Sequence, residues 1–201
     1  MRKWCAILLT LVLMLPLLCG CSPSAEGLLQ GQWKAKVDLA SAYEELLARS
    51  DASVAAHIDL SEFDVEVTIT FDQEGKYIIT ADQEALSIGA AKMELSIRSG
   101  LASYLQSQTG KTMDNLLTAT GMNFDDLMKN SFGSDLAGTI EGSLESEGTY
   151  KVSGSKLILK QTDGKKLFEG KFSVDEERLE LTSGVTTDLI SSLLPLQLKK
   201  K

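Results

Sequence analysis

Residues that could act as a nucleophile or a general base are few in this chain. His57 is the single histidine, so any Ser–His–Asp arrangement would have to use it as the base. It stands beside Ala55, Ala56 and Ile58, and no nucleophile motif lies near it in the sequence. We therefore expect His57 to be a structural residue and the protein not to be an enzyme.

Short motifs that resemble catalytic or nucleotide-binding sequences lack the context that such sites need. Thr109–Thr112 ends like a phosphate-binding loop, but Leu105 occupies the position where that loop needs glycine. Ser153–Lys156 spells Ser-x-x-Lys in a predicted turn, whereas penicillin-binding enzymes place this serine at a helix start. Asp125 and Asp126 are neighbours on a predicted helix, so their carboxylates point apart. The sequence predicts no catalytic residue, no cofactor and no metal site.

Residues 1–20 have the pattern of a signal peptide. Arg2 and Lys3 form a basic start, and an apolar run extends from Cys5 to Leu18. This run is shorter than the roughly 20 residues that a membrane-spanning helix needs. Small residues follow it, as at the cleavage site of an exported protein.

Leu18-Cys19-Gly20-Cys21 resembles the lipobox of bacterial lipoproteins. In that family the cysteine thiol receives diacylglycerol, and the signal peptide is removed in front of it. The resemblance implies that the protein is exported and that Cys21 anchors it in membrane lipid, on the extracytoplasmic face. A single acyl chain gives only marginal membrane binding, whereas the two chains of a diacylglycerol hold a protein firmly at the membrane. Residues 21–28 are then expected to be a lipidated tether; cleavage elsewhere, such as after Ala25, is the alternative.

Cysteine content and charge exclude further classes. The cysteines are Cys5, Cys19 and Cys21, so cleavage before a lipidated Cys21 would leave no free thiol and no disulfide. The net charge of −8 argues against nucleic acid as a partner, because nucleic acid binding needs basic patches. It also argues against lying flat on anionic lipid. The run Lys199–Lys201 is interpreted as a solvated tail.

Residues 29–201 are expected to form one domain in which two periodicities alternate. A two-residue period marks strands at 64–72 and 76–82. Helical periodicity marks two insertions, at about 38–63 and about 83–133, and Asp38 is expected to cap the first. The other strands are predicted at 31–37, 139–152, 156–161, 165–174, 178–182 and 193–199.

About eight strands, linked mostly as hairpins, close a small up-and-down barrel with room for side chains or one small ligand. Closure also removes exposed strand edges. The predicted fold is mainly β (α+β by content): an antiparallel, lipocalin-like barrel of about eight strands with two helical insertions packed on or over one end.

Two stretches resemble the bacterial lipocalin-like lipoproteins. Leu29–Lys34 contains Gly31-Gln32-Trp33, which is similar to the Gly-x-Trp opening of lipocalin-type barrels. Gly148–Lys160, continuing through Phe172 to Leu181, has a similar cadence of strands and glycine turns. The resemblance implies that Trp33 packs across the closed end of the barrel. The helical insertions depart from that family and leave open whether a ligand cavity remains.

Two classes of function stay open. In the first, the barrel holds a small apolar or amphipathic ligand, and the inward strand faces line the pocket: Val65, Val67, Ile69, Phe71, Tyr77 and Ile79. In the second, the barrel is filled, and the helices contact another envelope protein through one face: Leu86, Met93, Ile97 and Leu101. Ligand binding is favoured because barrels of this size often keep a cavity.

Overall fold

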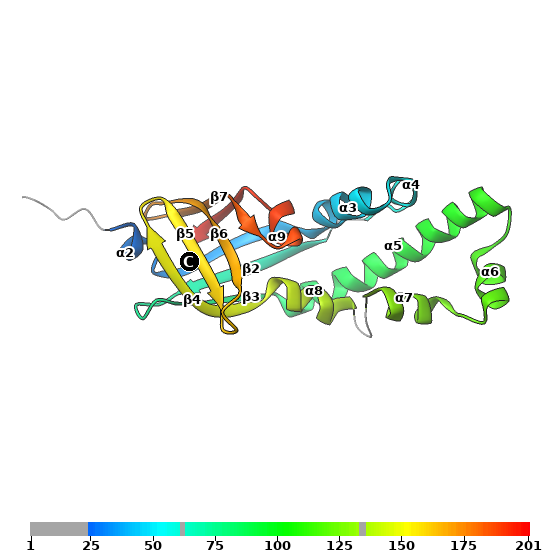
Figure 1. The fold of residues 1–201 in the computed structure, drawn as a ribbon, viewed down its shortest axis with the longest axis horizontal. Coiled ribbons are helices and arrows are strands. Elements are labelled where there is room, and N and C mark those ends of the chain that lie inside the picture. The colour runs from blue at the N-terminus through cyan, green and yellow to red at the C-terminus, as the bar shows by residue number, and fades with distance from the viewer. Residues whose placement is uncertain (1–23, 61–62, 133–135) are drawn as a thin grey trace, which may run out of the picture.

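The computed structural model describes residues 24–60, 63–132 and 136–201 and shows a closed antiparallel barrel joined to an elongated helical region (Figure 1). Each strand pairs with its neighbours in sequence, which confirms the predicted up-and-down barrel. The strands are β1 (Gly31–Asp38), β2 (Asp64–Phe71), β3 (Lys76–Ala81), β4 (Ser146–Ser153), β5 (Lys156–Gln161), β6 (Lys166–Val174), β7 (Arg178–Thr186) and β8 (Leu196–Lys200).

The sheet closes because β1 pairs with both β2 and β8. Along β1, Trp33 lies opposite Ile69 on one side and opposite Lys200 on the other. Alternation along the strands then sends apolar side chains inward, as in β2, where every second residue from Val65 to Phe71 is buried. The predicted two-residue period of β2 is thus the inside–outside pattern of the barrel.

The helices lie before β1 and in three of the connections between strands. They are α2 (Ala25–Leu29), α3 (Leu39–Ser50), α4 (Ala52–Ala55), α5 (Gln83–Thr109), α6 (Met113–Thr120), α7 (Phe124–Phe132), α8 (Leu136–Leu144) and α9 (Asp188–Ser192). In an up-and-down barrel successive connections alternate between the two ends. The connections β1–β2, β3–β4 and β7–β8 therefore leave from one end, and α3 to α9 gather there (Figure 1). We call this group of helices, α3 to α9, the helical arm.

Side-chain caps and glycines set the ends of these helices. Asp38 accepts a hydrogen bond from the backbone N–H of Ser41 at 3.0 Å, which confirms the predicted cap of α3. Thr112 caps α6 in the same way. Gly110 and Gly121 end α5 and α6 with φ of 68° and 71°, a left-handed conformation that glycine adopts without strain.

Three segments differ from the sequence prediction. Residues 139–144, predicted as strand, belong to helix α8, so the second insertion extends past 133 to Leu144. The reason is the helical spacing of Leu136, Ile140 and Leu144, all buried. Residues 25–28, predicted as tether, lie in α2, because Ser24 caps the helix and Leu29 is fully buried against the barrel.

The C-terminal segment also differs. The last strand was predicted at 193–199, but β8 occupies Leu196–Lys200 and is preceded by the short helix α9. Strand β7 is longer than predicted and reaches Thr186. Because β7 runs in the same direction as β1 and β3, α9 lies at the same end of the barrel as the other helical connections.

Helix α5 (27 residues) packs against the segment before β2 through two glycines on its buried face. A Cβ atom on Gly89 would lie 2.0 Å from the Phe63 ring, and one on Gly100 would lie 2.5 Å from the Ile58 side chain. Gly89, Met93, Ile97 and Gly100 lie at helical spacing on one buried stripe. The absence of side chains at the two glycines therefore lets α5 approach this segment closely.

The close packing of α5 against this segment predicts opposite effects for two glycine substitutions. Gly89→Ala should lower the free energy of unfolding by about 1–2 kcal/mol, because overpacking against Phe63 outweighs the gain in helix propensity. Gly142→Ala, in α8, should raise it by about 0.5–1 kcal/mol, because an added Cβ meets no atom within 4 Å there. Denaturant unfolding of both variants is the measurement. Stabilisation by both would contradict the packing described for α5.

Candidate functional site

The barrel interior is the candidate site, and its end opposite the helical arm is closed by Trp33. This residue is fully buried, and its indole Nε1–H donates to the carbonyl oxygen of Leu29 in α2 at 2.6 Å. The ammonium group of Lys200 lies 5.0 Å from the centre of the Trp33 ring, within the range of a cation–π contact. Trp33 and α2 together form the floor of the barrel.

The residues predicted to line a pocket form one wall of this interior. All six are buried, with side chains 1–7% exposed: Val65, Val67, Ile69, Phe71, Tyr77 and Ile79. The register of β2 and β3 brings them together, with Ile69 opposite Ile79 and Phe71 opposite Tyr77. Phe71 also packs edge-to-face on Tyr150, with ring centres 5.0 Å apart. The expected cluster therefore exists, but its members contact other core side chains.

The opposite wall comes from β5 to β8 and was not singled out in the sequence prediction. Its buried side chains are Leu157, Leu159, Phe168, Phe172, Leu179, Leu181 and Leu198. The Phe168 ring lies over Gly170 and Gly184, where added Cβ atoms would come within 2.6 and 2.8 Å of it. Inward apolar residues alternate with outward residues along much of β5 to β7. This alternation is the sequence signal that could have identified the wall.

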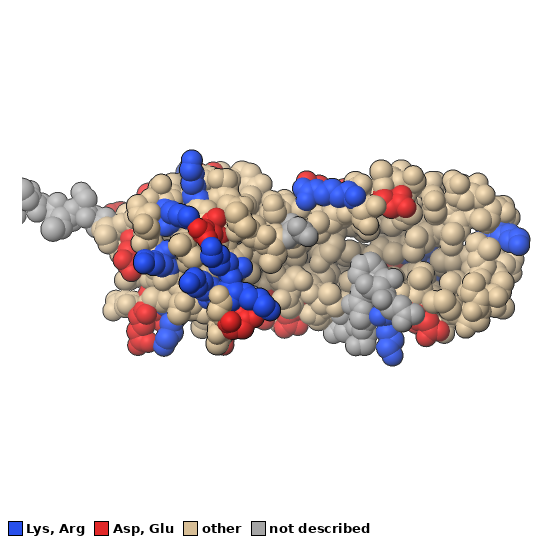
Figure 2. Space-filling model, in the orientation of Figure 1, with Lys and Arg blue, Asp and Glu red and all other residues tan. Residues whose placement is uncertain are grey.

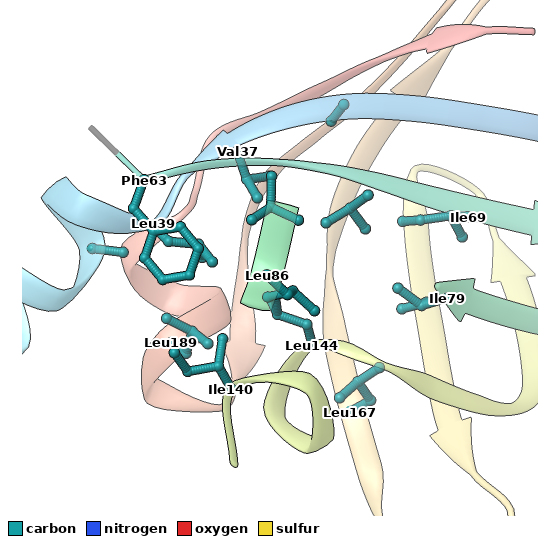
Figure 3. Close-up of a cluster of buried hydrophobic side chains, with 14 of the residues drawn as sticks. Val37, Leu39, Phe63, Ile69, Ile79, Leu86, Ile140, Leu144, Leu167 and Leu189 are labelled. Atoms are coloured by element: carbon teal, nitrogen blue, oxygen red, sulfur yellow. The ribbon is translucent and has the colours of Figure 1, made fainter. Parts of the chain in front are cut away.

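The helical arm closes the other end of the barrel. Figure 3 shows Leu86 of α5 and Leu144 of α8 below Val37 at the barrel mouth, with Ile69 and Ile79 farther into the barrel and with Ile140 of α8 and Leu189 of α9 on the side of Leu39 and Phe63. Leu39, at the start of α3, and Phe63, just before β2, join the same cluster, and all of these residues belong to one continuous core. The residues of the insertions that lie next to the strands therefore plug the mouth rather than form a separate layer above it.

Polar atoms of the interior are already paired within the chain. The Tyr77 hydroxyl lies 3.0 Å from that of Ser146, and the Tyr150 hydroxyl donates to the carbonyl oxygen of Asp72 at 2.7 Å. Burial raises the pKa of both tyrosines, so both stay neutral at physiological pH. Within the described parts of the chain, no buried side-chain nitrogen or oxygen lacks a hydrogen-bond partner. A ligand entering the barrel would meet no free polar anchor among these groups.

Hollows on the outer surface do not coincide with the predicted pocket. One lies over β3, β4 and β5 and is lined by outward residues such as Thr70, Ile78 and Lys160, with Tyr77 at its base. Another lies between α5 and the start of α6 and is lined by Leu95, among others. Of the six predicted lining residues, Tyr77 alone borders either of these two hollows.

His57 lies at the end of α4, away from the barrel. Its Nδ1 is 3.4 Å from the Ser103 hydroxyl, and its ring packs edge-to-face on Tyr104 at 5.6 Å. A catalytic Ser–His pair also needs a group that orients the imidazole, and no described carboxylate hydrogen-bonds to His57. The Ser103 hydroxyl and His57 are moreover outside any described hollow. This geometry fits the expected structural histidine.

Three further features concern the lipidation site, metal binding and membrane-spanning helices. Cys21, the predicted lipidation site, and the predicted signal peptide lie outside the described residues. Within the described residues, no three His, Cys, Asp or Glu side chains gather as a metal site would require. The same residues include no helix with both the length and the apolar character to cross a bilayer.

Comparison with known proteins identifies no relative: no family model matches the chain, and neither a curated protein nor a solved structure matches it significantly. The resemblance to lipocalin-like lipoproteins therefore stays a prediction.

The packing of the interior predicts how core truncation acts. Phe71→Ala should lower the free energy of unfolding by about 3–5 kcal/mol, because it removes contacts inside a filled core. Ile78→Ala, on the neighbouring strand but 49% exposed on the outer face, should change it by less than about 0.5 kcal/mol. Denaturant unfolding tests both. If Phe71→Ala were as mild as Ile78→Ala, Phe71 would border an open cavity instead.

Proposed function

We propose that this protein is a lipid-anchored, non-enzymatic interaction module of the cell envelope. The barrel acts as a solid scaffold, and the helical arm presents a surface to another envelope protein. Lipidation of Cys21 holds the module on the extracytoplasmic face of a membrane. This proposal ranks the two function classes in the opposite order to the sequence expectation.

One observation carries the proposal: the barrel core and the arm core are continuous. A lipocalin-type ligand needs a mouth to enter and polar groups to orient it. Here Leu86, Ile140 and Leu189 occupy the mouth, and the hydroxyls of Tyr77 and Tyr150 are paired internally. The interior therefore supports the fold better than it supports binding, and ligand binding by the six lining residues stays a prediction.

The surface of α5 that faces outward is not the one expected from the sequence. Leu86, Met93 and Ile97 are buried at 1–4% exposure, because they pack inside the arm, so they are not available to a partner. The opposite side of α5 exposes Ile88 at 52% and Leu95 at 67%. We define Ile88 and Leu95 as the exposed apolar pair of the arm.

The spacing of this pair suits a helical partner. Ile88 and Leu95 are seven residues apart, which places them two turns apart on one line of the helix. Leu95 also borders the hollow between α5 and α6, together with Ala102 and Met113. A helix laid along α5 could insert an apolar side chain there. The pair therefore supports a protein partner rather than a small ligand.

Lipidation gives the first test. Cys21→Ser should abolish incorporation of labelled palmitate and release the protein from membranes or leave it uncleaved, because the acylated sulfur is lost. Cys19→Ser is the matched control and should keep full labelling, because it changes a small residue of the signal peptide to another small residue. Equal labelling of the wild type and Cys21→Ser would show that Cys21 is not the lipidated residue.

The interaction surface gives the second test. A photo-crosslinking amino acid at Leu95 should capture a protein partner in the native envelope, because this side chain is exposed on the arm. The same amino acid at Val185, which is 78% exposed on the barrel, is the matched control and should capture no such partner. Native mass spectrometry of the purified mature chain should show the protein mass without a bound small molecule. A tightly bound small molecule, or identical adducts from both positions, would contradict the proposal.

A further inference from the structure

Lysines of this acidic protein are concentrated in one part of the chain. Residues 146–174, which form β4 to β6 and their turns, contain six lysines and three carboxylates, a net charge of +3. Because the whole chain has a net charge of −8, the residues outside this segment together carry −11. A single net charge for the protein conceals this separation.

The register of the strands brings five of these lysines to one outward face. Lys156 of β5 lies opposite Lys171 of β6, and Lys160 of β5 lies opposite Lys166 of β6. Lys151 of β4 lies opposite Ile158, beside these pairs. We call Lys151, Lys156, Lys160, Lys166 and Lys171 the lysine face. Figure 2 shows the lysines clustered on the barrel half of the molecule, whereas the arm carries few on this side.

Carboxylates balance part of the lysine face. Glu169 lies between Lys156 and Lys166 and forms ion pairs with both. Hydrogen bonds from these two ammonium groups lower the pKa of Glu169 to about 2, so it stays ionised at all physiological pH values. Lys151, Lys160 and Lys171 have no carboxylate within ion-pair distance among the described residues.

This arrangement has a cost for the fold. Like charges directly opposite each other on neighbouring strands are destabilising, and the face contains two such pairs. Lysines often protect the edge strand of a sheet from aggregation, but β4, β5 and β6 each have neighbours on both sides in a closed barrel. Edge protection therefore does not account for the lysine face.

The lysine face lies close to the N-terminal end of the described chain. Helix α2 contacts β6, so the start of the described chain lies beside the strands that carry the lysines. Three peptide steps separate Cys21 from Ser24, which allows at most about 11 Å of extended chain. A lipid on Cys21 would therefore keep the barrel, and not the arm, close to the membrane.

We propose that the lysine face docks on the anionic headgroups of the membrane that holds the lipid anchor. The proposal rests on the lipidation of Cys21 for its geometry. The arm would be repelled from the same surface, because residues 38–63 hold six carboxylates and one arginine, and residues 83–144 hold seven carboxylates and four cationic residues. Docking through the lysine face thus brings the barrel, rather than the acidic arm, into contact with the lipid.

The test uses the unlipidated mature chain, residues 21–201 with Cys21→Ser, which contains every described element. Its binding to vesicles of phosphatidylcholine with and without phosphatidylglycerol is measured by co-sedimentation at low ionic strength. The barrel variant combines Lys151→Glu, Lys160→Glu and Lys171→Glu, which breaks no ion pair of the described structure. The matched control combines Lys92→Glu, Lys111→Glu and Lys129→Glu, which are exposed on the arm and change the net charge equally.

We expect the parent chain and the arm variant to bind the anionic vesicles and not the neutral ones. The barrel variant should bind about 100-fold more weakly, from about five-fold for each lysine at a membrane surface, and high salt should abolish binding by all three. Circular dichroism identifies any variant that fails to fold. As a second measurement that needs no variant, anionic vesicles should shield Lys151, Lys160 and Lys171 from amine acetylation while Lys92 and Lys111 stay reactive.

Other outcomes overturn the proposal. An equal loss of binding in the barrel and arm variants would show that net charge alone acts. Binding to duplex DNA without binding to anionic vesicles would assign the lysine face to a different polyanion. Because the tested chain carries no lipid, its failure to bind vesicles would leave the palmitate result at Cys21 unaffected, so the two proposals fail separately.

Discussion

The alternation of connections between the two ends of an antiparallel barrel is the constraint on which the rest of this structure depends. Strand β1 leaves the floor, so the insertions after β1, β3 and β7 must all emerge at the other end. Their apolar faces then bury one another and the barrel mouth in one core. The elongated shape, the plugged mouth and the distance of the arm from α2 follow from this single rule of topology.

Close packing within that core depends on positions that lack side chains or carry large rings. Gly89 and Gly100 let α5 approach Phe63 and Ile58, and Phe168 covers the gap above Gly170. Inside the barrel, Trp33 and the paired tyrosines satisfy their own polar groups. The interior is therefore occupied by side chains that pack and pair with one another.

Those outer surfaces are separated along the molecule. The lysine face lies on β4 to β6, close to α2, and the exposed apolar pair lies on α5 in the acidic arm. A lipid at Cys21 would add a third feature at the barrel end. An anchor and a cationic face on the barrel, together with an acidic arm, favour contact with a membrane through the barrel rather than through the arm.

Local periodicity in the sequence was sufficient for much of the fold. The two-residue alternation of Val65 to Phe71 and the cap at Asp38 are short-range signals, and they predicted β2 and α3 correctly. Residues 139–144 differ from the prediction because the β-branched Thr139 and Ile140 favour a strand locally, whereas burial of Ile140 and Leu144 at the barrel mouth decides for a helix. The sequence also identified the inward wall of β2 and β3, but whether that wall encloses a ligand or a filled core depends on β5 to β8 and on the helices, which are distant in the chain. Net charge likewise does not show which residues share a face. Register across strands, a property of the tertiary structure alone, placed five lysines together.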